Sequence, residues 1–306
     1  MNRPNRVSRI CCWFLLLVSI SSFASIAAAE KKTSSKMKPL KYVPSPLKDV
    51  RLNDPRSPFQ FTLALEAGFT GIADHVVQFG KSGTEFNYVK DGGQDNLYLF
   101  LRLSFEMMIQ KRHHFVFLYQ PLDIRTQTIL RDRLVQDQAT FEAGEAVDFR
   151  YGFDFYRISY LYDFLETPKH ELSFGLSLQI RNATIVFSNV SGTKRSYRND
   201  VGPVPILKSR GNFSLPHQLF FGFEVDGFYA PIAYLNGSNS DVEGAILDAS
   251  LRFGRRVLPL MDLYFNIRYL GGGGVGTSSN ANEPNTDGYT LNWLHTFIFS
   301  LGVRVH

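Results

Sequence analysis

The chain has 306 residues, of which 44% are hydrophobic, 14% aromatic and 20% charged, with 24 glycines, 14 prolines and 2 cysteines. These values exclude a disordered chain, a collagen and a disulfide scaffold. The formal charge of +5 at pH 7 arises in the first 57 residues, so it does not indicate a nucleic-acid partner.

The first 29 residues predict a cleaved secretory signal peptide. Three arginines precede an apolar run that ends in three alanines, the order of basic, apolar and small residues that such a segment has. Both cysteines lie in it, so we expect a mature chain without disulfides or thiolate chemistry. Loss of its three arginines leaves 30 of the 33 Lys and Arg residues against 28 Asp and Glu, a balance near neutrality.

Residues 30–57 predict a basic, proline-containing periplasmic linker. This segment carries 8 Lys and Arg residues and 4 prolines, which is typical of an extended, solvated tail. The remaining residues, 58–306, are expected to form one folded domain.

Apolar and polar residues alternate with a period of two along this domain. Successive side chains of a strand point to opposite faces, so the alternation predicts strands with one apolar face. Pro121 and the segment around Arg157 indicate phase slips of the β-bulge type. Ten strands are predicted, with eight or twelve as alternatives: 59–71, 96–109, 113–130, 145–165, 170–188, 203–215, 218–231, 243–256, 260–273 and 288–305.

The connections between these strands alternate in length. Long polar segments follow the first, third, fifth, seventh and ninth strands, and tight turns follow the second, fourth, sixth and eighth. This arrangement is typical of bacterial outer-membrane barrels. Over residues 59–305 the chain resembles small bacterial outer-membrane β-barrel proteins in architecture, without the motif of a named family. The resemblance implies an all-β fold, a closed antiparallel transmembrane β-barrel with long outer loops and short periplasmic turns, in the bacterial outer membrane.

Charged residues are nearly absent from the apolar side of the three clearest strands, as expected where that side faces lipid. The opposite side should then face a polar lumen. In a barrel this narrow, the interior charges are expected to form a plugging network, and a charged narrow pore is the alternative. The predicted lumen network consists of Glu66, Arg102, Glu106, Arg150, Asp154, Arg181, Glu224, Asp248, Arg252 and Arg268.

Aromatic residues and one histidine of the last strand predict contacts with the membrane interface. Tyr289, Trp293 and His295 precede an alternating apolar series, where a ring can sit in lipid beside a polar group in water. We expect His295 to meet lipopolysaccharide phosphates. In barrels of this type the last strand is also the recognition signal for the insertion machinery, although this chain ends in Val305 and His306 rather than an aromatic residue.

Motifs of barrel enzymes are missing from the sequence. Omptin proteases pair two acids one residue apart with an acid and a histidine one residue apart. This chain has neither an Asp-x-Asp nor an Asp-x-His pair, and Asp74 and His75 are merely adjacent. Small-barrel lipid A deacylases use a histidine and a serine two residues apart, but His295 is followed by Thr296 and Phe297. No cluster has zinc-ligand spacing. No catalytic residue, metal or cofactor is therefore predicted.

The function predicted from these patterns is a structural or surface-interaction role in the outer membrane, with a plugged lumen. The partners would be outer-membrane lipid, lipopolysaccharide, the insertion machinery and extracellular ligands of the loops. A narrow solute-diffusion channel is the alternative, and a lipid A-modifying or proteolytic enzyme is a third hypothesis.

Overall fold

The computed structural model describes residues 57–306, except 138, 166, 168, 232–240 and 278–286. The predicted signal peptide and nearly all of the predicted linker lie outside these residues. Among the described residues, no helix is long and apolar enough to cross a membrane.

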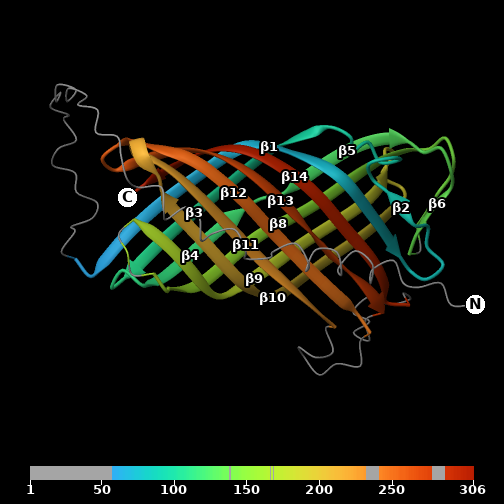
Figure 1. Ribbon diagram of the computed structural model, residues 1–306. Coiled ribbons are helices and arrows are strands. Elements are labelled where there is room, and N and C mark those ends of the chain that lie inside the picture. Colours follow the sequence, from blue (N-terminus) through green and yellow to red (C-terminus); the bar gives the residue numbers. More distant parts are fainter. Residues whose placement is uncertain (1–56, 138, 166, 168, 232–240, 278–286) are drawn as a thin grey trace, which may run out of the picture. The chain divides into compact units, whose positions relative to one another are not determined.

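The described chain forms a closed antiparallel barrel of ten strands, as predicted. Neighbours in sequence pair around the wall, and β14 pairs with β1 to close it (Figure 1). The strands of the wall are β1 (Phe59–Phe79), β3 (Leu97–Ile109), β4 (His113–Gln120) continued by β5 (Asp123–Ile129), β8 (Ala146–Asp163), β9 (His170–Asn189), β10 (Arg195–Ser214), β11 (Leu219–Pro231), β12 (Glu243–Leu258), β13 (Met261–Thr277) and β14 (Tyr289–Val305).

The two ends of the barrel differ. Turns of a few residues join β3 to β4, β8 to β9, β10 to β11 and β12 to β13, and we call this the short-turn end. At the opposite, long-loop end, residues 80–96 carry the short strand β2 (Phe86–Asn87). Residues 130–145 carry a hairpin of β6 (Leu134–Gln136) and β7 (Ala139–Phe141).

Several predicted boundaries at the long-loop end are wrong. The first strand continues to Phe79, and β10 begins at Arg195 rather than at 203, so the expected long loop after β9 is a tight turn at 190–194. The ninth predicted strand, 260–273, also extends further, as β13 to Thr277. In each case the strand extends beyond its lipid-facing part, and only that part has the alternation of apolar and polar residues from which the strands were predicted.

The phase slips predicted at Pro121 and near Arg157 are also wrong. Pro121 interrupts the strand, but β4 and β5 pair with β8 in one continuous register. Around Arg157, β8 alternates without a shift. The bulges lie between Ile72 and Asp74 and between Arg256 and Leu258.

An apolar belt encircles the outside of the wall. Its side chains are exposed large hydrophobic residues contributed by nearly every strand, a pattern that is favourable only where lipid replaces water. The belt includes Leu63, Leu65, Phe69, Leu99, Leu101, Phe117, Ile158, Phe174, Leu176, Leu178, Leu207, Val225, Leu251, Phe253, Phe265, Ile267, Phe297, Phe299 and Leu301.

Toward the long-loop end the two faces of the wall exchange character. On β8, Ile158 and Tyr160 face outward near the short-turn end, while Arg157 faces inward. Further along the same strand, Phe149 and Tyr151 are buried inside and Arg150 is outside. Near the short-turn end, the wall is apolar outside and polar inside, as in a membrane barrel. Nearer the long-loop end it is polar outside and apolar inside, as in a soluble barrel.

Candidate functional site

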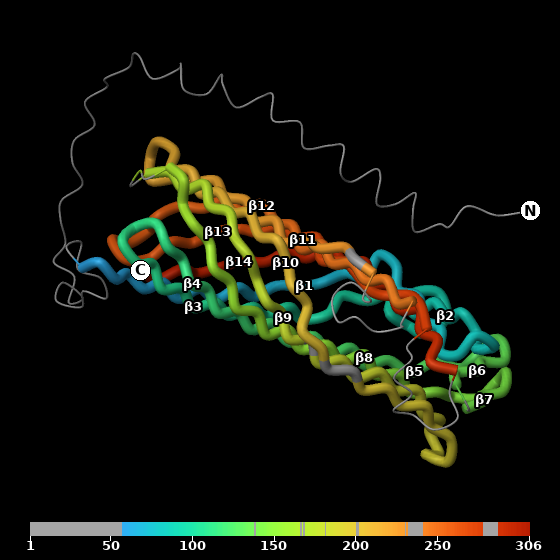
Figure 2. Tube along the Cα trace, turned by 90° about the horizontal axis from the view of Figure 1, so that it is seen from below, coloured from blue at the N-terminus to red at the C-terminus, as the bar shows by residue number. Residues whose placement is uncertain are grey.

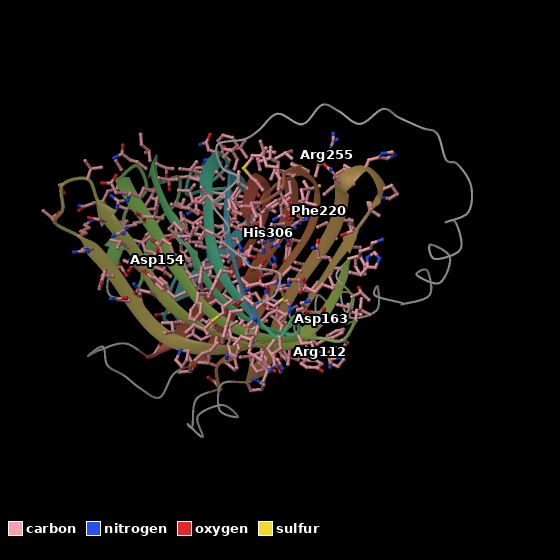
Figure 3. The ribbon with its side chains drawn as sticks, turned by 90° about the vertical axis from the view of Figure 1, so that its left-hand side faces the viewer. Arg112, Asp154, Asp163, Phe220, Arg255 and His306 are labelled. Carbon is pink, nitrogen blue, oxygen red and sulfur yellow. The ribbon has the colours of Figure 1, made fainter. Side chains whose placement is uncertain are left out.

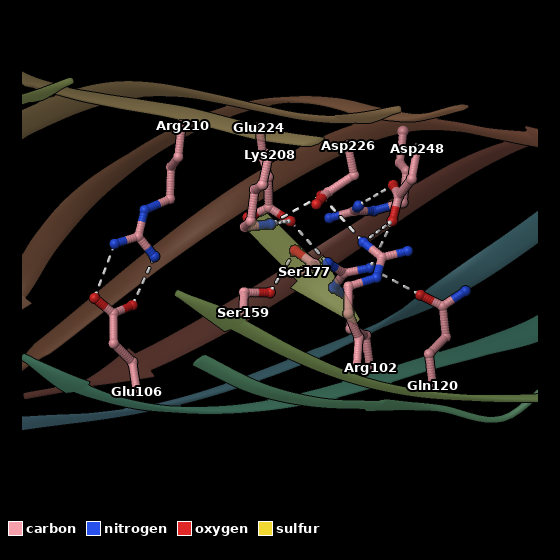
Figure 4. Close-up of polar contacts among 12 residues, drawn as sticks. Arg102, Glu106, Gln120, Ser159, Ser177, Lys208, Arg210, Glu224, Asp226 and Asp248 are labelled. Atoms are coloured by element: carbon pink, nitrogen blue, oxygen red, sulfur yellow. Dashed lines mark hydrogen bonds and ion pairs between the residues drawn. The ribbon is translucent and has the colours of Figure 1, made fainter. Parts of the chain in front are cut away.

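A network of ion pairs crosses the lumen at mid-height. Arg102 Nη2 lies 2.8 Å from Glu224 Oε1, and Arg102 Nη1 lies 3.2 Å from Asp248 Oδ2 (Figure 4). Arg157 Nη1 lies 3.0 Å from Asp226 Oδ2 and 3.1 Å from the same Asp248 oxygen. Arg102 of β3 and Arg157 of β8 thus reach across the barrel to carboxylates of β11 and β12.

Three further cations and an acid complete this level. Lys208 Nζ bridges Glu224 Oε1 at 3.0 Å and Asp226 Oδ2 at 2.8 Å. Arg268 pairs with Asp248. The final cation is Arg252, which lies 3.0 Å from Glu224 Oε2 and 3.5 Å from Glu66 Oε1.

A second cluster lies nearer the short-turn end. Arg210 donates to both carboxylate oxygens of Glu106, at 2.7 and 2.8 Å, and its Nε donates to Glu171 at 2.6 Å. His114 Nδ1 lies 2.6 Å from Glu106 Oε1. A bidentate pair of this kind fixes both side chains in direction as well as distance.

Formal charge balances across the two clusters. Six carboxylates face six permanent cations, and each of these groups is ion-paired at 4 Å or less: Glu66, Glu106, Glu171, Glu224, Asp226 and Asp248 with Arg102, Arg157, Lys208, Arg210, Arg252 and Arg268. Buried charges are tolerated when they are paired and hydrogen-bonded in this way.

Aromatic side chains fill the lumen toward the long-loop end. The loop 80–96 turns inward and places Phe86 and Tyr88 in the barrel, both at least 95% buried. The Phe86 ring stacks on Phe149 at 5.1 Å, and the Tyr88 ring lies 5.7 Å from Phe187. His75, fully buried, stacks on Tyr88 at 4.4 Å and shares a 2.7 Å hydrogen bond with Gln94. We call this group the aromatic plug.

Two cavities remain on either side of the charged level. One, of about 530 Å³, opens at the short-turn end beside His306 and Phe220 (Figure 3). The other, of about 590 Å³, is mostly apolar and lies beside the aromatic plug. Arg157 lines the first, and it donates at 2.6 and 3.0 Å to Gln179, which lines the second. The charged network therefore separates the two cavities.

The structure brings together seven of the ten residues predicted for the lumen. Glu66, Arg102, Glu106, Glu224, Asp248, Arg252 and Arg268 point into the barrel and form the contacts above.

The prediction for Arg150 and Asp154 is wrong. Both lie on the outward face of β8, where Arg150 is 44% exposed at its side chain and pairs with Asp123 at 2.8 Å. They follow the exchange of faces, because at their level the inward positions of β8 carry aromatic residues. Arg181 belongs to β9, but its side chain lies outside the described part of the structure.

Several residues of the network were not predicted. The phase slip expected near Arg157 left the face of that residue unassigned. Lys208 and Arg210 lie in a strand whose polar residues lack clear alternation. Their signal is present in retrospect: both share even-numbered, inward positions of β10 with Ile206.

The residues predicted for the membrane interface occupy the outward face of β14. Tyr289, Trp293 and His295 precede the belt residues Phe297 and Phe299 on that face. His295 Nδ1 forms a 2.6 Å hydrogen bond with the hydroxyl of Tyr269, its neighbour on β13. In the described ranges, no three His, Cys, Asp or Glu side chains are grouped to hold a metal.

No protein-family model and no curated protein matches this chain. Its fold is similar to solved outer-membrane barrels. The outer membrane protease OmpT from Escherichia coli is 9% identical with a TM-score of 0.47, over 80% of this chain and 96% of that one. Neisserial surface protein A is 14% identical (TM-score 0.29, 81% and 97%), and OprG from Pseudomonas aeruginosa is 10% identical (0.31, 80% and 96%).

The closed barrel, its apolar belt and its two unlike ends are those of a bacterial outer-membrane protein. In such barrels the long loops lie outside the cell and the short turns in the periplasm.

Proposed function

We propose that this protein is a non-conducting outer-membrane barrel that acts at the cell surface through its loops and outer wall. The observation that carries the proposal is the double obstruction of the lumen. The charged network spans the barrel at one level, and the aromatic plug fills it at the next. A solute would have to displace both.

The two obstructions would open in different ways. Opening the charged network requires its ion pairs to separate, whereas opening the aromatic plug requires the loop 80–96 to leave the barrel. That loop is held from outside, because Thr84 N donates to Val135 O at 2.8 Å and Gln136 Nε2 donates to Thr84 O at 2.9 Å. The hairpin β6–β7 thus keeps the aromatic plug in place.

Planar-bilayer recording of the refolded mature chain tests this proposal, with heat-modifiable gel migration confirming that the barrel is closed. We expect no steady openings from the wild type or from Arg102→Ala alone, because the aromatic plug remains. Arg102→Ala combined with Phe86→Ser and Tyr88→Ser should conduct. Steady openings of the folded wild type, with selectivity altered by Arg102→Ala, would instead establish the narrow diffusion channel.

The surface role is supported by a polar groove of about 540 Å³ on the outer wall, just beyond the belt. Arg125, Arg150, Arg195 and Asp148 line it. Arg125 and Arg150 share Asp123, at 2.9 and 2.8 Å. The three arginines outnumber the two carboxylates, so the groove carries net positive charge. Guanidinium groups at this level suit the phosphates of lipopolysaccharide.

Lipopolysaccharide retained on purification tests the groove. We expect the double variant Arg150→Ala and Arg195→Ala to retain several-fold less than the wild type. Arg133→Ala is the matched control, because Arg133 is an exposed loop arginine with one distant ion pair, 3.8 Å from Glu142. Equal retention by all three proteins would reject the groove as the binding site.

A further inference from the structure

The pairing of β10 with β11 stops halfway along the wall. Their register runs from Ser214 opposite Phe220 to Leu207 opposite Gly227, and no described residue pairs with this edge of β10 beyond Leu207. On its other edge, β10 stays paired with β9 to Arg195. Figure 2 shows the β9–β10 hairpin running away from β11 and β12 toward the long-loop end. We call the unpaired interval the seam.

Three prolines account for the seam. Continued in register, β10 and β11 would pair Pro205 with Tyr229 and Pro203 with Pro231. Proline has no N–H, so none of the three can donate to a ladder. What matters is the direction in which each missing donor would have pointed.

The ladder between β9 and β10 fixes that direction. At its two ends, Asn189 N donates to Lys194 O at 3.1 Å and Ser214 N donates to Lys169 O at 3.0 Å. Hydrogen-bonded pairs alternate in an antiparallel ladder, so even-numbered residues of β10 bond to β9 and odd-numbered ones face β11. Pro203 and Pro205 therefore remove donors from the seam edge alone, and the same alternation turns Pro231 toward it from β11.

Behind the seam lies the apolar cavity of about 590 Å³. Pro203, Val204, Pro205 and Phe228 line it at the seam. Glycines leave room for it, because inward positions of three strands carry no side chain: Gly202, Gly244 and Gly272. At Gly202, nothing lies within 4 Å of where a Cβ would stand.

The polar side chains in this lining, Tyr151, Gln179 and Asn292, already have partners. The Tyr151 hydroxyl and the Asn292 amide lie 3.3 Å apart within hydrogen-bonding reach, and Gln179 accepts from Arg157. An occupant therefore finds apolar walls formed by Phe153, Phe155, Leu270 and Leu294. The volume lies in the range of about 300–1,000 Å³ that is usual for small-molecule sites.

The mouth of the cavity opens onto the lipid-facing wall. Pro205 and Pro203 are in register with Leu178 and Ile180, belt residues that are 49% and 46% exposed. A second, shallow groove of about 400 Å³ runs along this wall between Phe115 and Leu207, and it shares Leu178, Pro205 and Phe228 with the cavity. The two form one apolar path from the belt into the barrel.

The break at Pro121 provides a comparison within the same barrel. There too, β3 and β5 are unpaired beyond Leu103 opposite Tyr119. The loop 80–96 covers that break from within, since Thr128 Oγ1 donates to Asp91 O at 3.0 Å and the Tyr98 hydroxyl donates to Gly93 O at 3.3 Å. No described residue covers the β10–β11 seam in this way.

We propose that the seam and the cavity behind it form a binding site for one acyl chain of a membrane lipid, which enters sideways from the bilayer. We choose lipid as the occupant because the mouth of the cavity lies among belt residues, which face the bilayer, rather than at either aqueous end of the barrel. The proposal goes beyond the surface role and does not require the lumen to conduct.

A photoactivatable phospholipid tests the site. The full mature chain is refolded into nanodiscs containing a phospholipid with a diazirine near the end of one acyl chain, irradiated, and mapped by mass spectrometry. We expect labels on Tyr151, Phe155 and Phe228 in the wild type, and at least a tenfold loss of these labels in Gly202→Trp, whose ring would fill the cavity.

The matched control is Gly71→Trp, an outward-facing glycine on β1 that borders Leu97, which should keep the cavity labels. Heat-modifiable migration verifies that each variant folds. Should Gly202→Trp not fold, the triple variant Pro203→Val, Pro205→Val and Pro231→Val replaces it, with the same loss expected. Labels confined to outward residues such as Leu207 and Leu251 in every variant would overturn the proposal. So would cavity labelling by a soluble diazirine fatty acid but not by the phospholipid.

Discussion

At the scale of single residues, an arginine on the inward face of a strand and an arginine on its outward face lie in different surroundings. Arg157 and Arg150 both belong to β8, but Arg157 is 2% exposed among Asp226, Asp248 and Gln179, whereas Arg150 lies on the outer wall. Removing one partner from a buried ion pair leaves an uncompensated charge, and removing an exposed one does not.

We therefore expect Arg157→Leu to lower the free energy of unfolding by about 3 kcal/mol or more. Arg150→Leu, its control on the same strand, should cost less than about 1 kcal/mol. Urea titration of the two proteins in lipid vesicles measures the difference. Equal costs would show that the lumen charges are hydrated rather than held in a dry network.

A surface carboxylate provides a pH-dependent contact between loops. Glu145 accepts from Lys194 Nζ at 2.9 Å, from Glu142 N at 2.9 Å and from Asn189 Nδ2 at 3.0 Å. The Lys194 hydrogen bond, followed by those of Glu142 and Asn189, lowers the pKa of Glu145 to about 2 from its ordinary value of 4.5.

A carboxyl group with a lowered pKa stabilises the fold above its unfolded-state value. The Glu145 contribution should be complete above pH 4.5, decline as the pH falls, and be gone below about 2. Carboxyl-carbon NMR titration should show the pKa of Glu145 raised toward its ordinary value in Lys194→Met, where the hydrogen bonds from Glu142 and Asn189 remain, and unchanged in Arg133→Ala. An unchanged pKa in Lys194→Met would contradict the assignment.

At the scale of elements, alternation identified most strands because lipid imposes it. In β1, β3 and β9 every second residue of the belt is apolar, and these strands were placed to within a few residues near the short-turn end. Beyond the belt that constraint ends. In β1 the bulge between Ile72 and Asp74 and the inward Val77 and Phe79 invert the pattern, so the continuation resembled a loop.

The same limit explains the errors in the candidate site. The rule that charged residues of a strand face the lumen applies only where lipid hydrocarbon surrounds the barrel. It does not apply at the level of Arg150 and Asp154, which face outward. The sequence also did not predict the seam, because the register is needed to show that Pro203 and Pro205 of β10 and Pro231 of β11 lie on facing strand edges. A single sequence does not contain that register.

The seam itself gives a prediction at this scale. The triple variant Pro203→Val, Pro205→Val and Pro231→Val restores three N–H groups to facing edges, so pairing should extend past Leu207. The amides introduced at positions 203 and 205 should then exchange at least ten times more slowly than the amide introduced by Pro259→Val, in the exposed turn between β12 and β13. Equally fast exchange at all three positions would mean that the prolines do not cause the opening.

At the scale of the whole molecule, closure depends on the contact between the first and last strands. Gly68 of β1 stands opposite Ser300 of β14, and a Cβ at this glycine would overlap the carbonyl oxygen of Phe299 and come within 2.6 Å of Ser300 Cα. Those are backbone atoms, which cannot move aside without separating the strands.

We expect Gly68→Val to abolish the heat-modifiable, closed form on gels. Gly202→Val, where the added atoms meet open space, should retain it. A normally closed Gly68→Val barrel would show that β1 and β14 can separate enough to admit a side chain while keeping their register.

The seam also bears on self-association. A free strand edge is ordinarily a template on which another chain can add a strand, and such edges lead to aggregation. Here the exposed edges of β10 and β11 carry proline at the positions where donors would be offered. The residues that hold the wall open therefore also make its edges poor partners for a neighbouring barrel, so the opening can persist in a crowded membrane without linking one copy to the next.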